Sequence, residues 1–492
     1  MQKLSNILKG VQYSGVADSR NISGIFYDSR KIKKDSLFIA IKGFNVDGHN
    51  FIDQAIELGA NAILLDQDIK NKHSVPFLKV KDSRKAMSKI ASNFFGDCSK
   101  NISITGITGT NGKTSITHLI NYILKYNDYA TSSLGTLGFY GPNGIKNTGF
   151  TTPESIELQN IFSTLVNGGV THLNMEISSH SIALNRIDDV DVDIAIFTNL
   201  TRDHLDFHKN MDEYFAAKLE LFKKLSPNKF AIINSDDSYS DKIKNHTKSR
   251  ILTYGFNKES DIYPINVNMS LTGSKFEINY KNKNFKIDTS LVGNFNISNI
   301  LASILACDIM GVKMDNIIEA INQFNLIPGR FESYRKKNGG IIIVDYAHTP
   351  DAFEKILSLV RSIQPSYKIT TLFGCGGDRD KDKRSIMGSI SEKFSDNIII
   401  TDDNPRYEDP NLIINHIVSG FSHQKYVICN DRKKAIEQAF SNLDVNQVLL
   451  ILGKGVEDYQ INQGQKTKHS DTKIIKELLW ELKFKKKNYL QN

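Results

Sequence analysis

The segment Gly106-Ile-Thr-Gly-Thr-Asn-Gly-Lys-Thr114 joins a predicted strand to a predicted helix. Glycine-rich backbone in this position presents N–H groups to phosphate oxygens, and the start of the helix adds its dipole. Lys113 would neutralise the terminal phosphates, and Thr114 would offer its hydroxyl to Mg²⁺. The strict phosphate-loop spacing fails, because the residue five positions before Gly112 is Ile107, so a glycine-rich turn without a ligand is the alternative. The strand–loop–helix context favours a nucleotide site.

Two further segments place acidic and imidazole groups after predicted strands. Glu176-Ile-Ser-Ser-His180 ends one strand, and its carboxylate can hold Mg²⁺, with a strand-end cap as an equal alternative. Thr198–His208 contains two histidines, two aspartates and one arginine, which suits phosphoryl transfer, with an ordinary polar loop as the alternative. In open parallel sheets, ligands bind at the carboxyl ends of strands, where these loops lie. Lys218 follows on a predicted helix, where a lysine taken alone indicates surface charge.

The elements that must position these loops alternate along the chain. Short β-rich runs alternate with helical patterns over residues 25–95, and the same alternation resumes after the Pro-Gly at 325–330. A chain of 492 residues is also too long for one hydrophobic core. We therefore predict an α/β protein with three domains, at residues 1–98, at residues 99–327 with a mostly parallel sheet, and at residues 328–492.

The composition is that of a soluble globular protein, with 40% hydrophobic and 24% charged residues and a mean hydropathy of −0.31. We find neither an apolar run long enough to span a bilayer nor a signal peptide, so membrane insertion is not expected. Four widely spaced cysteines indicate neither zinc nor disulfides and favour the cytoplasm. The net charge of +8 is densest at residues 482–490, where a solvated tail is the better interpretation and nucleic-acid binding the weaker one.

The candidate segments occur in an order that resembles the Mur ligases. The matching blocks lie between Tyr27-Asp-Ser-Arg30 and Gly453-Lys-Gly-Val-Glu457, nearly the whole chain, and they are GITGTNGKT, EISSH, TNLTRDHLDFH, the AAK of the following helix, LVGNFNISN, IPGRFE, VDYAHTPD, FGCGGDRDKDKR and TDDNPR. No block is decisive alone, but the ordered set is highly specific. The phosphate loop fits as well, because the loop of this family has the longer form.

The resemblance implies a small N-terminal α/β uridine-binding domain, a central P-loop ATPase and a C-terminal Rossmann-like domain that closes over the site. The blocks are most similar to family members that add 2,6-diaminopimelate to UDP-N-acetylmuramoyl-L-alanyl-D-glutamate. In this family ATP phosphorylates a carboxylate of the substrate, and the amine of the incoming amino acid attacks the acyl phosphate. The implied cofactors are ATP and Mg²⁺, and we expect a cytoplasmic monomer.

Carried across position by position, the resemblance implies a role for each of four sets of residues. ATP would contact Gly109, Thr110, Asn111, Gly112, Lys113, Thr114, Ser115, Asn294, Arg330 and Asp345. The catalytic residues would be Lys113, Glu176, His204 and Lys218, and the metal ligands Thr114, Glu176, His204 and Lys218 as a carbamate. The UDP-muramoyl peptide would contact Tyr27, Ser29, Phe44, Asn45, Val46, Thr151, Thr152, Ser178 and Arg186. Diaminopimelate would contact Arg379, Asp403, Asn404, Pro405, Arg406, Gly453 and Glu457.

The choice of amino acid depends mainly on Arg406, because lysine-adding relatives lack this arginine. meso-Diaminopimelate ends in a second carboxylate that an arginine holds bidentately, whereas lysine ends in an ammonium that an arginine repels. Glu457 is available for the distal ammonium. Two positions depart from the family pattern: Leu184 replaces a glutamine, which leaves one substrate contact unassigned, and Val456 replaces a histidine.

Two other functions are alternatives. The folylpolyglutamate synthases share the fold and the acyl-phosphate chemistry, but the blocks at Tyr27–Arg30 and Asp403–Arg406 argue against them. A nucleotide-binding regulator without turnover is the other alternative. The intact Lys113, Glu176 and Lys218 argue against a protein that has lost catalysis.

Overall fold

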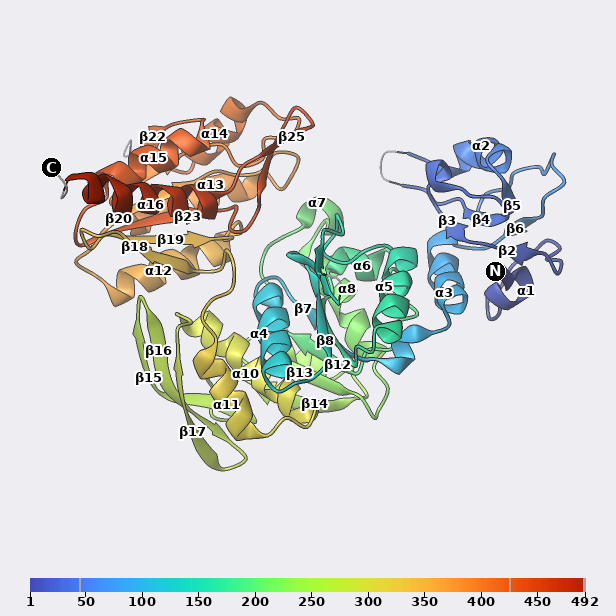
Figure 1. Cartoon of the computed structure of the whole chain (residues 1–492), viewed down its shortest axis with the longest axis horizontal. Helices are drawn as coiled ribbons and strands as arrows, with labels where there is room; N and C mark the ends of the chain where they lie inside the picture. Colours follow the sequence, from blue (N-terminus) through green and yellow to red (C-terminus); the bar gives the residue numbers. More distant parts are fainter. Residues whose placement is uncertain (44–45, 143, 424–425, 490–492) are drawn as a thin grey trace.

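The chain forms three sheets that follow one another along the sequence, and Figure 1 shows them as three neighbouring bodies. The computed structural model describes residues 1–43, 46–142, 144–423 and 426–489. The α/β architecture in three parts confirms the fold expected from the sequence. The boundaries at residues 98 and 327 stay a prediction.

The N-terminal part is built on a small, fully parallel sheet. In sheet order, its strands are β3 (Ile25–Phe26), β4 (Ser36–Ile39), β5 (Ala60–Leu65) and β6 (Phe77–Lys79). The elements around it are β1 (Gln2–Lys3), α1 (Leu4–Ile7), β2 (Asn21–Ile22), α2 (Ile52–Glu57) and α3 (Ser83–Phe95). Asp82 caps α3 by accepting hydrogen bonds from the backbone N–H groups of Arg84 and Lys85, which fixes where the helix begins. The helices α2 and α3 are those expected from the helical patterns of this region.

The central part is built on an eleven-stranded sheet that is parallel in its middle and antiparallel at both edges. In sheet order, its strands are β10 (Gly144–Lys146), β9 (Gly138–Gly141), β8 (Thr131–Gly135), β11 (His172–Glu176), β7 (Ser103–Thr108), β12 (Ile194–Phe197), β13 (Phe230–Asn234), β14 (Arg250–Tyr254), β15 (Ile262–Ser270), β16 (Gly273–Tyr280) and β17 (Lys283–Thr289). The parallel strands β8, β11, β7, β12 and β13 all end at the same edge, so the loops that follow them come together there.

The helices of the central part are α4 (Lys113–Tyr126), α5 (Ser155–Asn167), α6 (Ser179–Ala183), α7 (Leu205–His208), α8 (Met211–Lys223), α9 (Ser240–Lys244), α10 (Asn294–Ile309) and α11 (Met314–Gln323). Helix α4 packs beside α10, as Figure 1 shows. The periodic apolar side chains of α4 are fully buried, and they are Ile116, Leu119, Ile120, Ile123 and Leu124. Burial stabilises the fold by roughly 1.5–3 kcal/mol for each such side chain, so this helix holds the preceding loop firmly in place.

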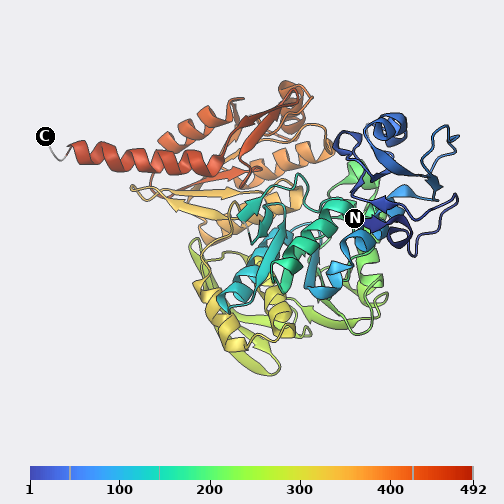
Figure 2. The ribbon, with the colours of Figure 1, turned by 45° about the vertical axis from the view of Figure 1, so that its right-hand side comes forward.

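The C-terminal part is a six-stranded sheet with one antiparallel edge strand, β18. In sheet order, its strands are β18 (Glu332–Arg335), β19 (Ile341–Asp345), β23 (Gln447–Leu452), β20 (Lys368–Phe373), β21 (Asn397–Ile400) and β22 (Tyr426–Ile428). The remaining elements are α12 (Pro350–Ile363), α13 (Asp382–Phe394), α14 (Pro410–Val418), α15 (Arg432–Asn442), the hairpin β24 (Tyr459–Asn462) and β25 (Gln465–Lys468), and α16 (Asp471–Tyr489). Figure 2 shows α16 extending away from the rest of the molecule.

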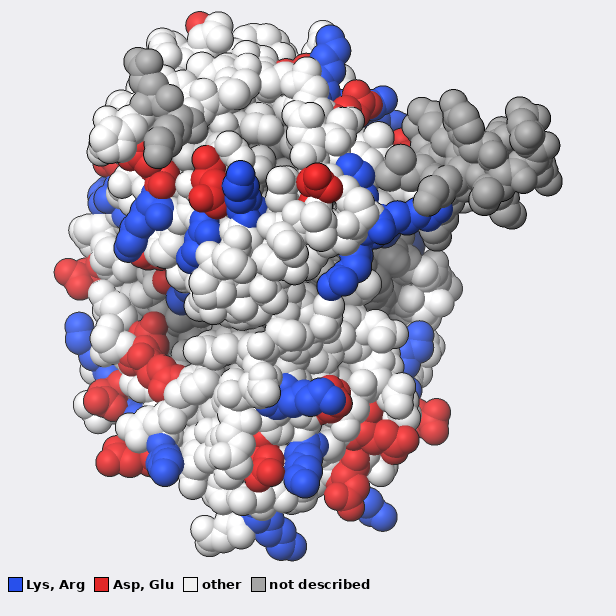
Figure 3. Space-filling model, turned by 90° about the vertical axis from the view of Figure 1, so that its left-hand side faces the viewer, with Lys and Arg blue, Asp and Glu red and all other residues white. Residues whose placement is uncertain are grey.

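The surface bears on nucleic-acid binding and membrane insertion, the two interactions that the sequence disfavours. On the face in Figure 3, lysine and arginine side chains lie among aspartate and glutamate side chains, so the positive charge is not gathered in one place there. The side chains of the basic stretch at residues 482–490 lie outside what the structure describes. Among the described residues, no helix combines the length and the apolarity that a membrane span requires.

Polar contacts join the three parts. Between the N-terminal and central parts, an Arg84 guanidinium nitrogen lies 3.2 Å from Glu154 Oε1. Between the central and C-terminal parts, Arg202 Nε lies 3.2 Å from Asp380 Oδ2. Since both contacts lie beside predicted site blocks, the interfaces and the predicted site occupy the same region.

Candidate active site

The loop between β7 and α4 needs glycine at two positions. Gly109 has φ +146°, and a Cβ atom there would lie 1.8 Å from Thr198 Oγ1. Gly112 has φ +90°, and a Cβ atom there would lie 2.6 Å from Asn299 Oδ1. Lys113 begins the helix and donates hydrogen bonds to the carbonyl oxygens of Gly109 and Thr110 at 2.9 and 2.8 Å. The loop therefore has the curled backbone and the cation that phosphate binding requires.

The carboxylate of Glu176 lies beside this loop, at the end of β11. The hydroxyl of Thr114 donates to Glu176 Oε1 at 2.9 Å, and the backbone N–H of Thr136 donates to the same oxygen at 2.8 Å. Arg330, which follows the central part, donates to Thr114 Oγ1 at 3.1 Å. The Glu176 side chain is almost fully buried, at 1% exposure. Two predicted metal ligands, Thr114 and Glu176, are therefore in direct contact.

Lys218 is buried on α8 rather than exposed on the surface, with 1% exposure. Its Nζ donates to the carbonyl oxygen of Gly109 at 2.9 Å and lies 4.4 Å from the centre of the Tyr214 ring. Burial, and secondarily the charge of Lys113, lowers the pKa of Lys218 well below its ordinary value, which favours the neutral amine. In the described part of the chain this lysine has no carboxylate within ion-pair distance. The tertiary fold thus reverses the interpretation of this residue as surface charge.

His204 lies at the start of α7 with φ +55°, an uncommon conformation for a residue with a side chain. Its Nε2 lies 3.4 Å from Asp203 Oδ2, and its ring packs edge-on against His180 at 4.8 Å between centroids. Burial lowers the pKa of His204, so the imidazole is neutral at physiological pH. A neutral imidazole is the form that binds a metal ion.

Two adjoining cavities are formed around these groups. The smaller, about 130 Å³, is lined by the phosphate loop, Glu176, His204 and Lys218. The larger, about 610 Å³, extends past the start of α10 to the C-terminal part. Both cavities share the residues Asn111, Gly112, Arg330, Tyr346 and His348. A small polar chamber that opens into a larger, partly apolar pocket fits a triphosphate joined to a nucleoside.

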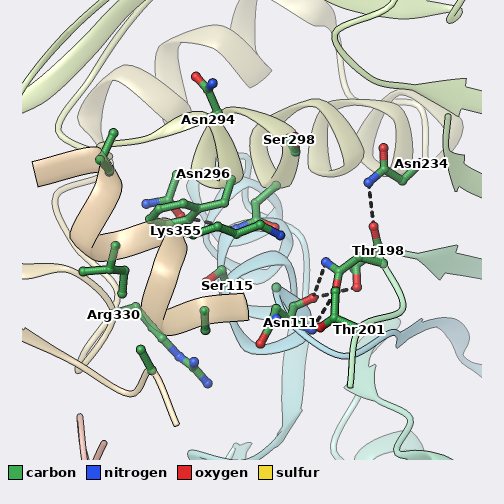
Figure 4. A pocket seen from close by; sticks show the side chains of 18 of the residues that line it. Asn111, Ser115, Thr198, Thr201, Asn234, Asn294, Asn296, Ser298, Arg330 and Lys355 are labelled. Carbon is green, nitrogen blue, oxygen red and sulfur yellow. Dashed lines mark hydrogen bonds between the residues drawn. The ribbon is translucent and has the colours of Figure 1, made fainter. Parts of the chain in front are cut away.

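The larger cavity contains the remaining residues of the predicted ATP set. Figure 4 shows Asn111 and Thr198 on one wall, Asn294 at the start of α10, and Arg330 on the side of the C-terminal part. Ser115 also lines this cavity. The sequence brought these residues together only through the resemblance, whereas the structure places them around one space.

Asp345 links two backbone segments by hydrogen bonds. Its two carboxylate oxygens accept hydrogen bonds from the backbone N–H groups of Phe331 and Ala347, both at 2.6 Å. Burial raises the pKa of Asp345 to about 6, although Arg330 acts in the opposite direction. The Arg330 guanidinium lies 4.6 Å from the centre of the Tyr346 ring. Asp345 therefore fixes the two segments that carry Arg330 and Tyr346 into both cavities.

The predicted UDP-peptide residues of the central part gather on the other side of Glu176. Thr152 Oγ1 donates to the Glu176 carbonyl oxygen at 2.9 Å and lies 3.4 Å from Ser178 Oγ, while Thr151 Oγ1 lies 3.3 Å from Thr136 Oγ1. Arg186 is held by an ion pair with Glu154 at 2.9 Å. Thr151 and Ser178 also line the smaller cavity, so this set adjoins the phosphate chamber.

The residues of the N-terminal part that are predicted to bind the UDP-muramoyl peptide are less closely grouped. Tyr27 donates a hydrogen bond to Glu157 of α5 at 3.0 Å, which links the N-terminal and central parts. Ser29 is buried and donates to Gln54 at 3.0 Å, whereas Val46 is 57% exposed. Phe44 and Asn45 lie outside the described residues.

The predicted diaminopimelate-binding residues come from the loops after β20, β21 and β23. Asn404 Nδ2 donates to Glu457 Oε2 at 2.9 Å, which joins the last two of these loops. Arg406 has φ +56° and donates from Nη1 to the Gly377 carbonyl oxygen at 2.6 Å. Arg379 is exposed and donates to the Asp378 carbonyl oxygen at 3.1 Å. Asp403, Pro405 and Gly453 lie in the loops after β21 and β23, as their places in the chain require.

Sequence reasoning missed Lys454 in this pocket. It is fully buried and contacts Asp403, Asn404 and Glu457. Its position between Gly453 and Glu457, both of which the sequence did indicate, was the available signal.

Behind this pocket, a buried ion pair fixes the end of β23. Arg432 donates two hydrogen bonds to Asp471, at 2.9 and 2.7 Å, and one to the Leu452 carbonyl oxygen at 3.0 Å. Both side chains are fully buried. Burial opposes ionisation of Asp471, but Arg432 and His469 outweigh it and hold the pKa of Asp471 below its usual range. The stabilisation is therefore present at neutral pH and is lost only as the pH falls below about 4, through the folded pKa.

We expect Asp471→Asn to lower the stability of the C-terminal part by about 3–5 kcal/mol, because it leaves the Arg432 charge buried without its counter-ion. In calorimetry, the corresponding unfolding transition should fall by roughly 6–15 °C. Glu437→Gln on α15, a partly exposed position, is the matched control, and its transition should be unchanged. Equal melting temperatures for Asp471→Asn and the native chain would show that the pair is not stabilising.

The acidic and imidazole side chains of the smaller cavity do not by themselves complete a metal site. In the described part of the chain, no group of three or more His, Cys, Asp or Glu side chains is arranged to hold a metal. The predicted set contains only two such residues, Glu176 and His204. A carbamate on Lys218 would add a third anionic oxygen donor, and the hydroxyl of Thr114 and phosphate oxygens would complete a set of the hard ligands that Mg²⁺ prefers. The residues fit Mg²⁺ only together with a bound phosphate and a modified lysine.

Comparison with known proteins gives matches over most of the chain. Residues 107–307 match the family model described as Mur ligase middle domain, residues 329–455 match Mur ligase, glutamate ligase domain, and residues 21–95 match Mur ligase family, catalytic domain. The UDP-N-acetylmuramoyl-L-alanyl-D-glutamate–2,6-diaminopimelate ligase of Caldanaerobacter subterraneus subsp. tengcongensis is 40% identical over 97% of this chain and 99% of its own length. The ligase of the same name from Clostridium botulinum is 41% identical over 97% of this chain and its full length.

A solved structure of a UDP-N-acetylmuramoyl-L-alanyl-D-glutamate–2,6-diaminopimelate ligase is similar over the whole fold. It has a TM-score of 0.70 at 28% identity and covers 98% of this chain and 99% of its own. Sequence and fold therefore match the same group of enzymes over their full length.

Proposed function

Because the chain belongs to the Mur ligase family, we infer that it is an ATP-dependent ligase that adds meso-2,6-diaminopimelate to UDP-N-acetylmuramoyl-L-alanyl-D-glutamate. The reaction is a step in the synthesis of peptidoglycan precursors. The observation that carries this proposal is the full-length similarity to diaminopimelate ligases together with Arg406 in the amino-acid pocket. The folylpolyglutamate alternative has no such support, and a regulator without turnover does not explain why Glu176, His204 and Lys218 line the phosphate chamber.

The proposed reaction is the acyl-phosphate chemistry that the family resemblance implies, and the two adjoining cavities support it. A carboxylate oxygen of the substrate glutamate attacks the γ-phosphorus of ATP, the bond to the β–γ bridging oxygen breaks, and ADP leaves. The amine of diaminopimelate then attacks the acyl carbon, loses a proton and expels phosphate. Lys113 and Arg330 line the smaller cavity and would offset the negative charge of the transferred phosphoryl group.

Mg²⁺ would be held by Thr114, Glu176, His204 and Lys218 as a carbamate. When bound, it supplies positive charge that stabilises the developing charge on the phosphoryl oxygens. Lys218 supports this assignment, because a buried amine with a depressed pKa is the form that reacts with carbon dioxide.

The remaining residues position the two substrates. Tyr27, Ser29, Val46, Thr151, Thr152, Ser178 and Arg186 would bind the UDP-muramoyl peptide, with Phe44 and Asn45 completing the set. Arg406 would hold the distal carboxylate of diaminopimelate, and Glu457 its distal ammonium. The residues Arg379, Asp403, Asn404, Pro405 and Gly453 would shape this pocket.

The proposal also includes a monomeric enzyme that works in the cytoplasm, where both ATP and a nucleotide-linked substrate are available. The three domains would be residues 1–98, 99–327 and 328–492. Gel filtration and expression of the separate segments test these parts of the proposal.

Leaving out one substrate at a time tests the proposed reaction. With Mg²⁺ present, ADP release should require the UDP-linked dipeptide, and meso-diaminopimelate should convert the dipeptide to a product heavier by one diaminopimelate less one water. ADP release that depends on folate and glutamate instead would favour the folylpolyglutamate alternative. Without ADP release in any mixture, the protein would be the regulator.

A further inference from the structure

Lys454 is a buried cation beneath the proposed amino-acid pocket. Its side chain is fully buried, and its Nζ lies 3.3 Å from Asp403 Oδ1, 3.1 Å from Asn404 Oδ1 and 3.1 Å from Glu457 Oε2. A buried ammonium requires such partners, because an unpaired charge in the interior costs several kcal/mol. One lysine thus joins the loop after β21 to the loop after β23.

These contacts decide which way the Asn404 amide points. Its Oδ1 accepts from Lys454 and from the backbone N–H of Ile461, at 3.1 and 3.0 Å. The reversed amide would place N–H donors against two other donors, so only one orientation is satisfied. In that orientation Nδ2 faces Glu457 at 2.9 Å.

The same contacts leave one oxygen of Glu457 available. Lys454 and Asn404 both donate to Oε2, whereas Oε1 has no hydrogen-bond partner among the described residues. An oxygen with free lone pairs, on a carboxylate that is held from behind, is suited to accept a hydrogen bond from a substrate ammonium.

Negative charges do not outnumber positive ones in this pocket. Asp403 and Glu457 are negative, and Lys454, Arg406 and the exposed Arg379 are positive. The distal end of diaminopimelate carries an ammonium and a carboxylate and is neutral, whereas that of lysine carries an ammonium alone. A pocket with separated charges and no net negative charge matches the first and gives the second no net attraction.

We propose that Lys454 is a positioning and specificity-determining residue of the ligase: it holds Asn404 and Glu457 in the orientation that receives the distal ammonium and balances the charge that would otherwise attract lysine. This inference rests on the proposed function. It differs from a purely structural role, because it predicts a change in the choice between two amino acids.

The test is Lys454→Met, which keeps most of the side-chain volume and removes the charge. We expect the KM for meso-diaminopimelate to rise about tenfold or more, and the ratio of kcat/KM for meso-diaminopimelate over that for L-lysine to fall about tenfold or more. The KM values for ATP and for the UDP-linked dipeptide should stay unchanged. Lys454→Arg, which keeps the charge, should restore most of the ratio. The exposed Lys468→Met on β25 is the matched control and should behave as the native chain.

Two outcomes would overturn the inference: an unchanged amino-acid ratio in Lys454→Met, or an equal fall of kcat/KM for both amino acids. If the native chain itself shows no diaminopimelate-dependent ADP release, the proposed function fails instead, and the two failures are thereby distinguished.

A second comparison decides the case if Lys454→Met does not fold. Glu457→Gln removes the carboxylate that Lys454 is proposed to hold, and Lys454→Met in that background leaves a single buried carboxylate, Asp403. The added change should then raise the KM for meso-diaminopimelate less than about threefold, because its effect passes through Glu457. A rise of tenfold or more in this background would show that Lys454 acts independently of Glu457 and would contradict the inference.

Discussion

Replacing Lys218 by alanine is expected to lower the turnover number for ADP release by about 10²–10³-fold, the effect of removing one group that stabilises charge in the transition state. The reason lies in its position: the amine is fully buried beside the phosphate loop and donates only to the Gly109 carbonyl oxygen among the hydrogen bonds of the described residues. A carbamate there would supply the anionic donor that Glu176 and His204 leave missing. The measurement is ADP release at saturating substrates.

The exposed Lys223→Ala, on the same helix, is the matched control and should retain full activity. Formate added to Lys218→Ala is expected to restore part of the turnover, because a small carboxylate can enter the space left by the side chain. A carbonyl carbon signal from ¹³C-bicarbonate on the native chain, lost in Lys218→Ala, would identify the carbamate directly. Full activity of Lys218→Ala would contradict the metal-ligand assignment.

The second large effect is expected at Arg406. Arg406→Ala should lower kcat/KM for meso-diaminopimelate by at least about 30-fold, equivalent to about 2 kcal/mol, the lower end of the cost of truncating one partner of a hydrogen-bonded charge pair. The side chain is already oriented, because Nη1 is held by the Gly377 carbonyl oxygen, and a Cβ atom at Gly376 would lie only 2.8 Å from Nη1. The KM for ATP should not change, because the ATP cavity does not include this residue.

The exposed Arg335→Ala on β18 is the control for the loss of one positive charge, and its kinetics should match those of the native chain. Arg406→Lys should recover little, because an ammonium lacks the planar pair of donors that matches a carboxylate. If Arg406→Ala uses meso-diaminopimelate as well as the native chain does, the distal carboxylate is held elsewhere.

The local sequence pattern was sufficient to predict those helices and strands whose own apolar residues show which side is buried. The apolar spacing of α4 predicted a helix buried on one face, and Ile116, Leu119 and Ile120 are fully buried. The antiparallel strands β15–β17 were not predicted. Their alternation of buried and exposed side chains, as in β16, is weaker than the continuous apolar runs of the parallel strands and gives no long buried stretch to recognise.

The site could be predicted only where a residue type is unusual in its own segment. The phosphate loop is such a segment, and its glycines meet the steric need that the structure shows at Gly109 and Gly112. Lys218 lies on an ordinary helix, so nothing local distinguishes it from surface charge. Its Nζ contacts the carbonyl oxygen of Gly109, which is distant in sequence and near only in the folded chain.

The same limit applies to the contacts between the parts of the molecule. Arg330 reaches Thr114 of the central part across 216 positions of sequence. Within the C-terminal part, Lys454 reaches Asp403 across 51 positions. Such pairs depend on how the sheets are packed and on the order of the strands within a sheet, which periodicity cannot supply. The resemblance to a family indicated Arg330, whereas Lys454 emerged only from the structure.

The measurement that tests the central claim most directly uses the native chain and compares two amino acids as its substrates. Purified protein, ATP, Mg²⁺ and UDP-N-acetylmuramoyl-L-alanyl-D-glutamate are supplied with either meso-diaminopimelate or L-lysine, and ADP release and product mass are followed. We predict that kcat/KM for meso-diaminopimelate exceeds that for L-lysine by at least about 10²-fold, because the pocket is built to hold the second carboxylate. Equal values, or a preference for L-lysine, would contradict this account of the enzyme.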